Sequence, residues 1–342
     1  MADPIFPSAE LPPVLLSVVV PVYNEASVLP EFHRRLGAVL AALPMRSEVV
    51  YVNDGSGDDT ATIVAGLAGT DPRVASIELS RNFGKEIAMT CGLDHAQGDA
   101  VVIIDADLQD PPELIPRLVD EWRAGFDVVY ARRSERRGET WLKKTTATLF
   151  YRLIQRIGQV SIPRDTGDFR LMSRRAVLAL LQLREKHRFM KGLFAWIGFP
   201  QKAVDYCREP RFAGDSKFDY WKLWNFALEG LTSFTIAPLK LATYIGLFTA
   251  LLAFGYGGWI IAKTLLYGET VRGYPTVMVT ILFLGGVQLM SIGVIGEYLG
   301  RTYDESKRRP LYFVKGYRPA RSSGDRRVAV TPIGERRRLR TG

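Results

Sequence analysis

Short apolar runs alternate with segments of helical spacing along the N-terminal part of the chain. The apolar runs are Leu15–Tyr23, Glu48–Asp54, Val74–Leu79, Ala100–Asp105 and Asp127–Ala131. In the segments between them, as in Ala26–Leu43, apolar side chains recur at helical spacing. Strands that are apolar on both faces and alternate with helices are typical of a parallel sheet covered on both sides. The pattern predicts an α/β fold for this part of the chain.

Two stretches of 22 residues nearer the C-terminus, Leu241–Ala262 and Pro275–Gly296, contain no charged residue. Each is long enough to cross a hydrocarbon core of about 30 Å as a helix. Their length, their glycines and the lack of an amphipathic period favour membrane spans over buried core helices. We predict two transmembrane helices, at about 241–265 and 275–298.

Positive charge at the ends of these stretches predicts their orientation. Lys240 precedes the first stretch, Arg301 and Lys307–Arg309 follow the second, and the loop 263–274 carries two basic residues and one acidic residue. This asymmetry places both flanks on the cytoplasmic side of the inner cell membrane. Residues 1–14 show neither a basic nor an apolar signal region, so no secretory signal is predicted there.

Charge and cysteine content indicate which partners the chain could bind and in which compartment it lies. The net charge is +9, and residues 318–342 are rich in arginine. On the cytoplasmic side of a hairpin, such a tail is explained by attraction to anionic lipid or by solvation alone, and nucleic-acid binding is not expected. Only Cys91 and Cys207 occur, without metal-type spacing, which suits a reducing compartment.

Polar residues follow several of the predicted strands, where parallel sheets bind ligands. They are Asn24 and Glu25, Asn53 and Asp54, Asp105 and Asp107, and Arg132 and Arg133. Helix caps would explain any one of these pairs, but acids and arginines at several strand ends favour a binding site. The usual glycine-rich phosphate loops are missing. The segment Gly55–Thr60 begins like the dinucleotide motif G-x-G-x-x-G, but Thr60 stands in place of its third glycine.

A diphosphate ligand without a glycine cradle is commonly neutralised by a divalent cation. Asp105 and Asp107 are two residues apart, so their carboxylates point the same way on an extended backbone, and Gln109 adds an amide oxygen. These three residues are the predicted ligands of Mg²⁺ or Mn²⁺.

Several motifs together resemble a known family. They are VVVPVYNE (Val18–Glu25), VNDGSGDDT (Val52–Thr60), LSRNFGKEIAMTCGL (Leu79–Leu93), DADLQDPPE (Asp105–Glu113), TGDFRLMSRRA (Thr166–Ala176), RFAGDSKF (Arg211–Phe218) and GEYLGRTYDESKRRP (Gly296–Pro310). In this order they resemble the inverting glycosyltransferases of family two, and most of all the polyprenyl-phosphate hexose synthases. That group includes dolichyl-phosphate mannose synthases and bactoprenol glucosyl transferases. The resemblance implies the A-type glycosyltransferase fold, with a Rossmann-like sheet.

The resemblance also implies roles for individual residues. The positions that match a nucleobase and ribose site are Pro21, Tyr23, Glu25 and Asp54. The positions that match the diphosphate–metal site are Asp105, Ala106, Asp107 and Gln109. The basic positions implied to contact the diphosphate or the acceptor phosphate are Arg132, Lys143, Lys144, Arg211 and Lys217. A lipid-facing patch is the alternative for these basic residues.

Asp168 resembles the acidic residue that is usually called the general base of this superfamily. A lipid phosphate has a second pKa near 6, so its nucleophilic oxygen is already ionised at neutral pH. Alignment of that oxygen and stabilisation of the leaving diphosphate are then the main requirements. We therefore expect Asp168 to order basic groups or the acceptor pocket. A structural role in the turn before Phe169 is the alternative.

These observations predict a catalytic membrane protein. The expected parts are a flexible N-terminus (1–14), a cytoplasmic catalytic domain (15–216), a juxtamembrane interfacial helix (217–238), a transmembrane hairpin (239–300) and a basic cytoplasmic tail (301–342). A second basic amphipathic segment, Glu139–Ile157, is expected at the membrane interface or packed on the sheet. Gly296 and Gly300 form a G-x-x-x-G motif that would support a homo-oligomer.

The expected reaction moves one hexose, with inversion, from a nucleotide diphosphate sugar to a polyprenyl phosphate of the undecaprenyl type. Glucose from UDP-glucose is the first choice, and the product would serve as a lipid-linked donor for cell-envelope glycans. GDP-mannose and UDP-amino-sugars are the alternative donors. A processive polysaccharide synthase would need a Q-x-x-R-W motif, which is absent. A membrane-anchored subunit that only binds nucleotide sugars remains a non-enzymatic alternative.

Overall fold

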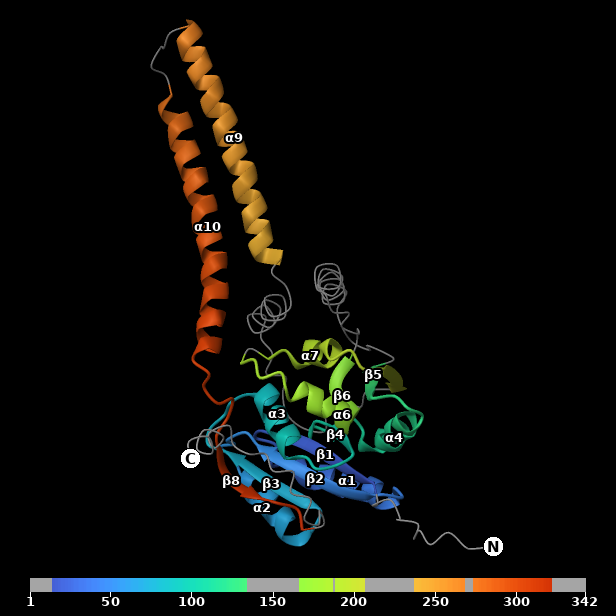
Figure 1. Cartoon of the computed structure of the whole chain (residues 1–342). Helices are drawn as coiled ribbons and strands as arrows, with labels where there is room; N and C mark the ends of the chain where they lie inside the picture. The colour runs from blue at the N-terminus through green and yellow to red at the C-terminus, as the bar shows by residue number, and fades with distance from the viewer. Residues whose placement is uncertain (1–13, 134–165, 187, 207–236, 268–272, 322–342) are drawn as a thin grey trace, which may run out of the picture.

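The computed structural model describes residues 14–133, 166–186, 188–206, 237–267 and 273–321. Its described strands form one eight-stranded sheet, and two long helices rise from this sheet domain (Figure 1). The strands are β1 (Leu15–Val22), β2 (Arg46–Asn53), β3 (Val74–Leu79), β4 (Ala100–Ile103), β5 (Val128–Arg133), β6 (Thr166–Ser173), β7 (Gln201–Tyr206) and β8 (Val314–Arg318). Their order across the sheet is β7-β5-β6-β4-β1-β2-β3-β8.

The predicted parallel sheet is present and is extended by antiparallel strands. Strand β1 pairs in parallel with β2 and β4, β2 with β3, and β5 with β7. Strand β6 lies antiparallel between β4 and β5. Since β6 runs the opposite way, its first residues lie at the same edge of the sheet as the last residues of β4.

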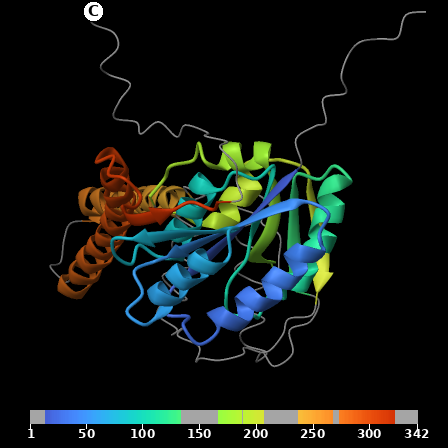
Figure 2. The same cartoon turned by 90° about the horizontal axis from the view of Figure 1, so that it is seen from below.

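Helices cover both faces of the sheet, as the doubly apolar strands predict (Figure 2). The helices on one face are α1 (Leu29–Ala42), α2 (Thr60–Thr70) and, after the short η1 (Pro112–Leu114), α4 (Ile115–Arg123). Those on the other face are α3 (Lys85–His95), α6 (Arg174–Leu180) and α7 (Met190–Trp196). Strand β1 serves both cores, because Val18 and Val20 face the first set and Val19 faces the second.

Helix α3 packs unusually close to the sheet, and one glycine permits this. A Cβ atom on Gly92 would lie 2.2 Å from Val19 Cγ1, so any larger residue would force the helix away from β1. The close approach matters for the site described below, because the first residue of α3 is Lys85.

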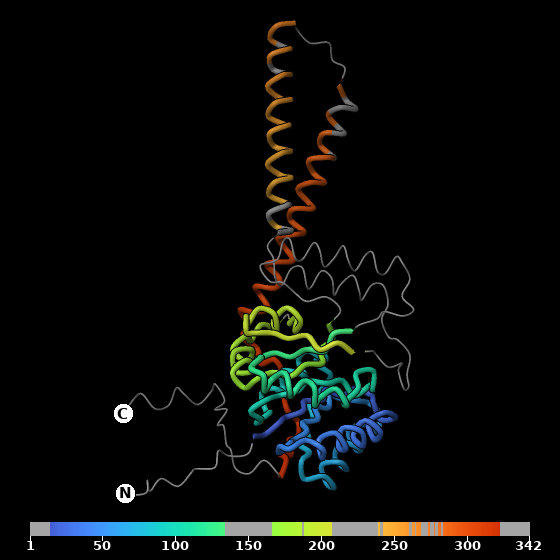
Figure 3. The backbone as a smooth tube through the Cα atoms, turned by 90° about the vertical axis from the view of Figure 1, so that its right-hand side faces the viewer, coloured from blue at the N-terminus to red at the C-terminus, as the bar shows by residue number. Residues whose placement is uncertain are grey.

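The two long helices are α9 (Ala237–Tyr267) and α10 (Tyr274–Ser306), which lie side by side as a hairpin (Figures 1 and 3). Both are longer than the predicted spans. Many of their apolar side chains are exposed, including Phe254 and Leu265. By length and composition, the described part of the chain contains one segment able to cross a membrane, Phe283–Ser306, with a hydropathy of 1.2. A second span and the orientation stay predictions.

The segment after the hairpin returns to the sheet. The sequence pattern predicts only a basic tail for residues 301–342. Strand β8 pairs antiparallel with β3 and forms an edge of the sheet. Its approach is fixed by Tyr312, whose hydroxyl donates a 2.7 Å hydrogen bond to Asp94 Oδ2 on α3. At the foot of α10, the Lys186 backbone N–H donates to Glu305 Oε1 at 2.6 Å. The sheet domain and the hairpin are therefore joined by side-chain contacts as well as by the chain.

Candidate active site

A cavity of about 440 Å³ lies at the carboxyl ends of β1, β2 and β4 and beside the first residues of β6. Among its lining residues are the predicted Pro21, Tyr23, Glu25, Asp54, Asp105, Ala106, Asp107 and Asp168. The lining also includes three basic residues, Lys85, Arg133 and Lys191. The fold thus brings the predicted nucleotide residues, the predicted cation ligands and a cluster of positive charge to one place.

Backbone hydrogen bonds fix the part of the cavity that contains Asp54. Its carboxylate accepts hydrogen bonds from the N–H groups of Phe83, at 2.7 Å, and Gly84, at 2.9 Å. Burial raises the pKa of Asp54, and these two N–H groups act in the opposite direction. The next residue, Gly55, has φ +66°, and a Cβ there would lie 2.6 Å from the Arg81 carbonyl carbon. A glycine is therefore needed for the loop to pass so close to its neighbour.

The loops after β1 and β2 are also tied to each other. The Gly57 N–H donates to Asn24 Oδ1 at 2.9 Å, and the Glu25 N–H donates to Thr60 Oγ1 at 2.9 Å. Asn24 has a positive φ of 55°, a conformation that asparagine tolerates better than most residues. These bonds hold Tyr23, which is 42% exposed, at the mouth of the cavity.

Asp105 and Asp107 both line the cavity, as their spacing predicts. Gln109 is not among the lining residues, and its backbone N–H donates to Asp107 Oδ1 at 3.1 Å. Within the described residues, no group of three or more histidine, cysteine or acidic side chains is arranged to hold a metal ion. Two carboxylates nevertheless fit a hard divalent cation that takes its remaining ligands from substrate phosphates and water.

Lys85 connects the predicted cation site with Asp168. Its Nζ lies 2.7 Å from Asp105 Oδ2 and 2.6 Å from Asp168 Oδ2. Burial raises the pKa of Asp105 to about 6, against the effect of the Lys85 ammonium. Burial has the same tendency at Asp168, but the charges of Lys85, Lys191 and Arg170 outweigh it and hold the pKa of Asp168 below its ordinary value. Asp168 is therefore an ionised carboxylate at neutral pH.

The two arginines at the end of β5, Arg132 and Arg133, differ in where their side chains lie. Arg133 lines the cavity, whereas Arg132 forms a two-point ion pair with Asp205, with distances of 2.6 and 2.9 Å. Successive side chains of a strand point to opposite faces, so only one of two adjacent arginines can enter the cavity. The structure thus places Arg133, rather than the predicted Arg132, in the wall of the site.

Several predicted site residues lie outside the part of the chain that the structure describes. Lys143, Lys144, Arg211 and Lys217 lie outside the described residues, as do most of the two segments predicted at the membrane interface. Conversely, the sequence pattern did not single out Lys85 or Lys191. Lys85 stands within one of the motifs of the resemblance, which offered a signal, but Lys191 lies on α7 with no motif around it.

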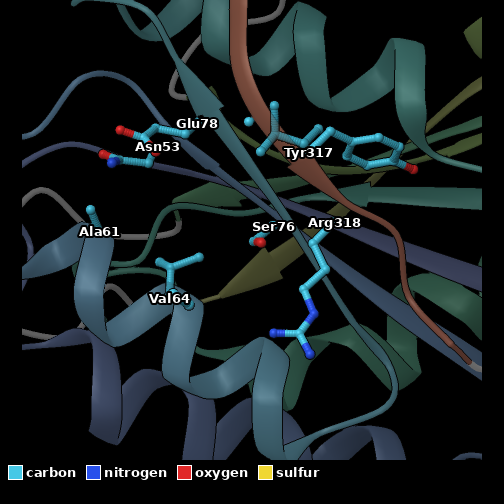
Figure 4. Close-up of a pocket in the computed structure, with 10 residues that line it drawn as sticks. Asn53, Ala61, Val64, Ser76, Glu78, Tyr317 and Arg318 are labelled. Carbon is cyan, nitrogen blue, oxygen red and sulfur yellow. The ribbon is translucent and has the colours of Figure 1, made fainter.

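A second cavity, of about 220 Å³, lies between α2, β3 and β8 (Figure 4). Asn53 and Glu78 lie close together on one side of it, and Arg318 extends toward α2. Of the polar residues predicted at the strand ends, Asn53 lines this cavity, whereas Glu25, Asp54, Asp105, Asp107 and Arg133 line the first one. The first cavity is therefore the candidate active site.

Comparison with known proteins gives two family matches. A profile described as glycosyl transferase family 2 matches residues 17–181, and one described as the GtrB C-terminal hairpin matches residues 237–302. An uncharacterized glycosyltransferase of Synechocystis sp. is 55% identical over 299 residues, which cover 87% of this chain and 94% of the relative.

Two further comparisons concern a named enzyme and a solved structure. A bactoprenol glucosyl transferase of Shigella phage SfV is 52% identical over 300 residues, covering 88% of this chain and 98% of the relative. The crystal structure of glucosyl-3-phosphoglycerate synthase from Mycobacterium tuberculosis, in complex with Mn²⁺, UDP-glucose and phosphoglyceric acid, has a TM-score of 0.45 and 22% identity. That match covers 64% of this chain and 78% of the other.

Proposed function

The chain belongs to glycosyl transferase family 2, and we propose that it transfers one glucosyl group from UDP-glucose to a polyprenyl phosphate of the undecaprenyl type. The relative from phage SfV, which is matched along almost its whole length, is named for glucosyl transfer to bactoprenol. The match to the GtrB C-terminal hairpin extends this similarity to α9 and α10. The product would be a lipid-linked sugar donor for modification of cell-envelope glycans.

One observation carries the proposal. The same cavity is lined by the four predicted nucleotide-binding residues, by Asp105 and Asp107, and by the basic residues Lys85, Arg133 and Lys191. A nucleotide diphosphate sugar needs a surface for its base and ribose and positive charge around its diphosphate. An acceptor phosphate needs further positive charge beside the anomeric carbon.

A divalent cation is part of the proposal. Asp105 and Asp107 would hold Mg²⁺ or Mn²⁺, and the bound ion would neutralise charge on the departing diphosphate. Gln109 is proposed as the third ligand, and its backbone N–H donates to Asp107 Oδ1. The two carboxylates, the donor set expected for such an ion, support this assignment.

Asp168 is proposed to orient basic groups, not to remove a proton. Its lowered pKa makes it a weak base, since an effective general base has a pKa near the working pH. Its Oδ2 atom is held by Lys85, which keeps the ammonium in the cavity wall. The acceptor oxygen, already ionised, needs alignment and receives it from the basic residues around Asp168.

The hairpin of α9 and α10 would anchor the enzyme in the inner cell membrane. With both flanks on the cytoplasmic side, the sheet domain would meet UDP-glucose in the cytoplasm and polyprenyl phosphate at the membrane surface. The exposed apolar side chains of both helices support contact with lipid.

The proposal is tested with membranes that contain the protein, incubated with undecaprenyl phosphate and a panel of radiolabelled UDP-glucose, GDP-mannose and UDP-amino-sugars. We expect label in the lipid fraction from UDP-glucose, and none in membranes that contain Asp107→Asn. Label from GDP-mannose or an amino-sugar alone would correct the donor. Retention of UDP-glucose by the protein without any labelled lipid would favour a binding subunit and refute the enzymatic function.

A further inference from the structure

The ammonium of Lys85 occupies the space between two carboxylates of the candidate active site. Its Nζ is 2.7 Å from Asp105 Oδ2 and 2.6 Å from Asp168 Oδ2, so both contacts are charge-assisted hydrogen bonds. Asp105 follows β4 and Asp168 belongs to β6, so Lys85 on α3 connects three separate elements. The carboxylates it joins are otherwise like charges facing the same cavity.

The backbone around Lys85 is built to present it in this way. Gly84 has φ +97°, which lets the chain turn into α3 directly before Lys85. The Gly84 N–H is also bonded to Asp54, so the position of Lys85 is linked to the nucleotide side of the cavity. The close packing of α3 at Gly92 against Val19 further limits the movement of this helix.

A second observation concerns the other oxygen of Asp168. Asp168 Oδ1 is buried and has no hydrogen-bond partner among the described residues. Asp168 is only 11% exposed at its side chain, whereas Lys85 is 42% exposed. The carboxylate is therefore enclosed in the wall, whereas the more exposed lysine has a flexible four-carbon stem that allows it to leave Asp105 without leaving Asp168.

We propose that Lys85 is a positioning residue that holds Asp105 and Asp168 in place before the divalent cation binds, and that it competes with the cation for Asp105. This inference rests on the cation in the proposed function. The ammonium already occupies one oxygen of the Asp105 carboxylate that would hold the cation, and its positive charge repels the ion. Once the cation is bound, Lys85 stays paired with Asp168 and directs its remaining N–H groups at a phosphate oxygen.

The competition has a consequence that a merely structural lysine would not have. Replacing Lys85 with methionine keeps the length of the side chain and removes its charge, so Asp105 is released and the repulsion of the cation is lost. Two unit charges about 4 Å apart interact substantially even when screened by nearby solvent. The variant should therefore bind a divalent cation more tightly, while its transferase activity falls because Asp168 has lost its partner.

The experiment measures Mn²⁺ binding to the purified full-length protein by electron paramagnetic resonance, without donor or acceptor. For Lys85→Met we expect a Kd at least about tenfold lower than that of the wild type. The matched control is Lys315→Met, because Lys315 Nζ lies 2.7 Å from Glu78 Oε1 and neither residue lines the active-site cavity. This control should bind Mn²⁺ as the wild type does. Lys85→Arg, which keeps the charge, should bind no more tightly than the wild type.

Equal or weaker Mn²⁺ binding by Lys85→Met would overturn the inference while leaving the proposed function intact. Tight binding by Lys85→Arg would overturn it too, because the charge would then be irrelevant. If neither the wild type nor any variant binds Mn²⁺ or Mg²⁺, the cation in the proposed function fails and the inference fails with it. Thermal melting of each variant identifies unfolded protein, and Lys85→Gln replaces Lys85→Met if the methionine variant does not fold.

Discussion

Replacing Asp168 with asparagine removes one negative charge from the cavity wall and keeps the shape of the side chain. The hydrogen bond to Lys85, 2.6 Å long, then loses its charge-assisted character. Such bonds contribute about 1.5–3 kcal/mol. If that whole amount is lost in the transition state, the rate falls by about ten- to a hundredfold, since each ~1.4 kcal/mol is a factor of ten.

The pH dependence of the rate separates this loss of alignment from the loss of a base. The pKa of Asp168 is held below its ordinary value, so its protonation falls outside the range from about pH 5 to 9. The acid limb should instead follow the second pKa of the acceptor phosphate, near 6. The wild type and Asp168→Asn should therefore share one midpoint, with a lower plateau for the variant.

The assay records initial rates for both proteins with donor, lipid and Mn²⁺ saturating. Saturating Mn²⁺ matters because burial raises the pKa of Asp105 to about 6, and a bound cation keeps that carboxylate ionised. If the acid limb disappears or moves in Asp168→Asn, Asp168 is the general base and the reasoning from its ion pairs is wrong. A loss greater than about ten-thousandfold would point the same way.

Three further predictions follow from the site and the hairpin. Asp107→Asn should lower transfer at least about a hundredfold in saturating Mg²⁺ or Mn²⁺, because a neutral amide does not supply the negative charge with which a carboxylate holds the cation; full activity of the wild type in EDTA would refute the role of the cation. Arg133→Ala should reduce transfer more than Arg132→Ala, measured as kcat/KM for UDP-glucose, since only Arg133 lines the cavity; the reverse order would restore the role predicted for Arg132. A cysteine at Thr270 should react with a membrane-impermeant reagent on intact cells, and one at Ser323 should not; labelling of Ser323 would refute the orientation.

The strands of the central sheet could be predicted closely from the sequence. The run Val74–Leu79 is β3 itself, and the runs predicted from Leu15 and Ala100 begin where β1 and β4 begin. These strands are buried on both faces, so their continuous apolar runs are a strong signal. Strands β6, β7 and β8 were not predicted, because each mixes polar or charged residues with apolar ones and β8 is exposed along its length.

The candidate site was predictable as far as it is built from strand ends. Asp54, Asp105 and Asp107 follow strands directly, so their convergence follows from the parallel sheet. The basic half of the cavity was not predictable in the same way. Lys191 comes from a short helix late in the chain, and the choice between Arg132 and Arg133 depends on which face of β5 meets the cavity. Tertiary packing decides both.

The measurement that tests the central claim most directly is the identity of the lipid formed by the purified protein from UDP-glucose and undecaprenyl phosphate. Mass spectrometry gives the number of hexoses on the lipid, and nuclear magnetic resonance gives the configuration at the anomeric carbon. We predict undecaprenyl phosphate that carries one glucose in β linkage, the inverse of the α linkage in the donor. Free glucose without a glycolipid, a chain of several sugars, or an α-linked product would contradict the account.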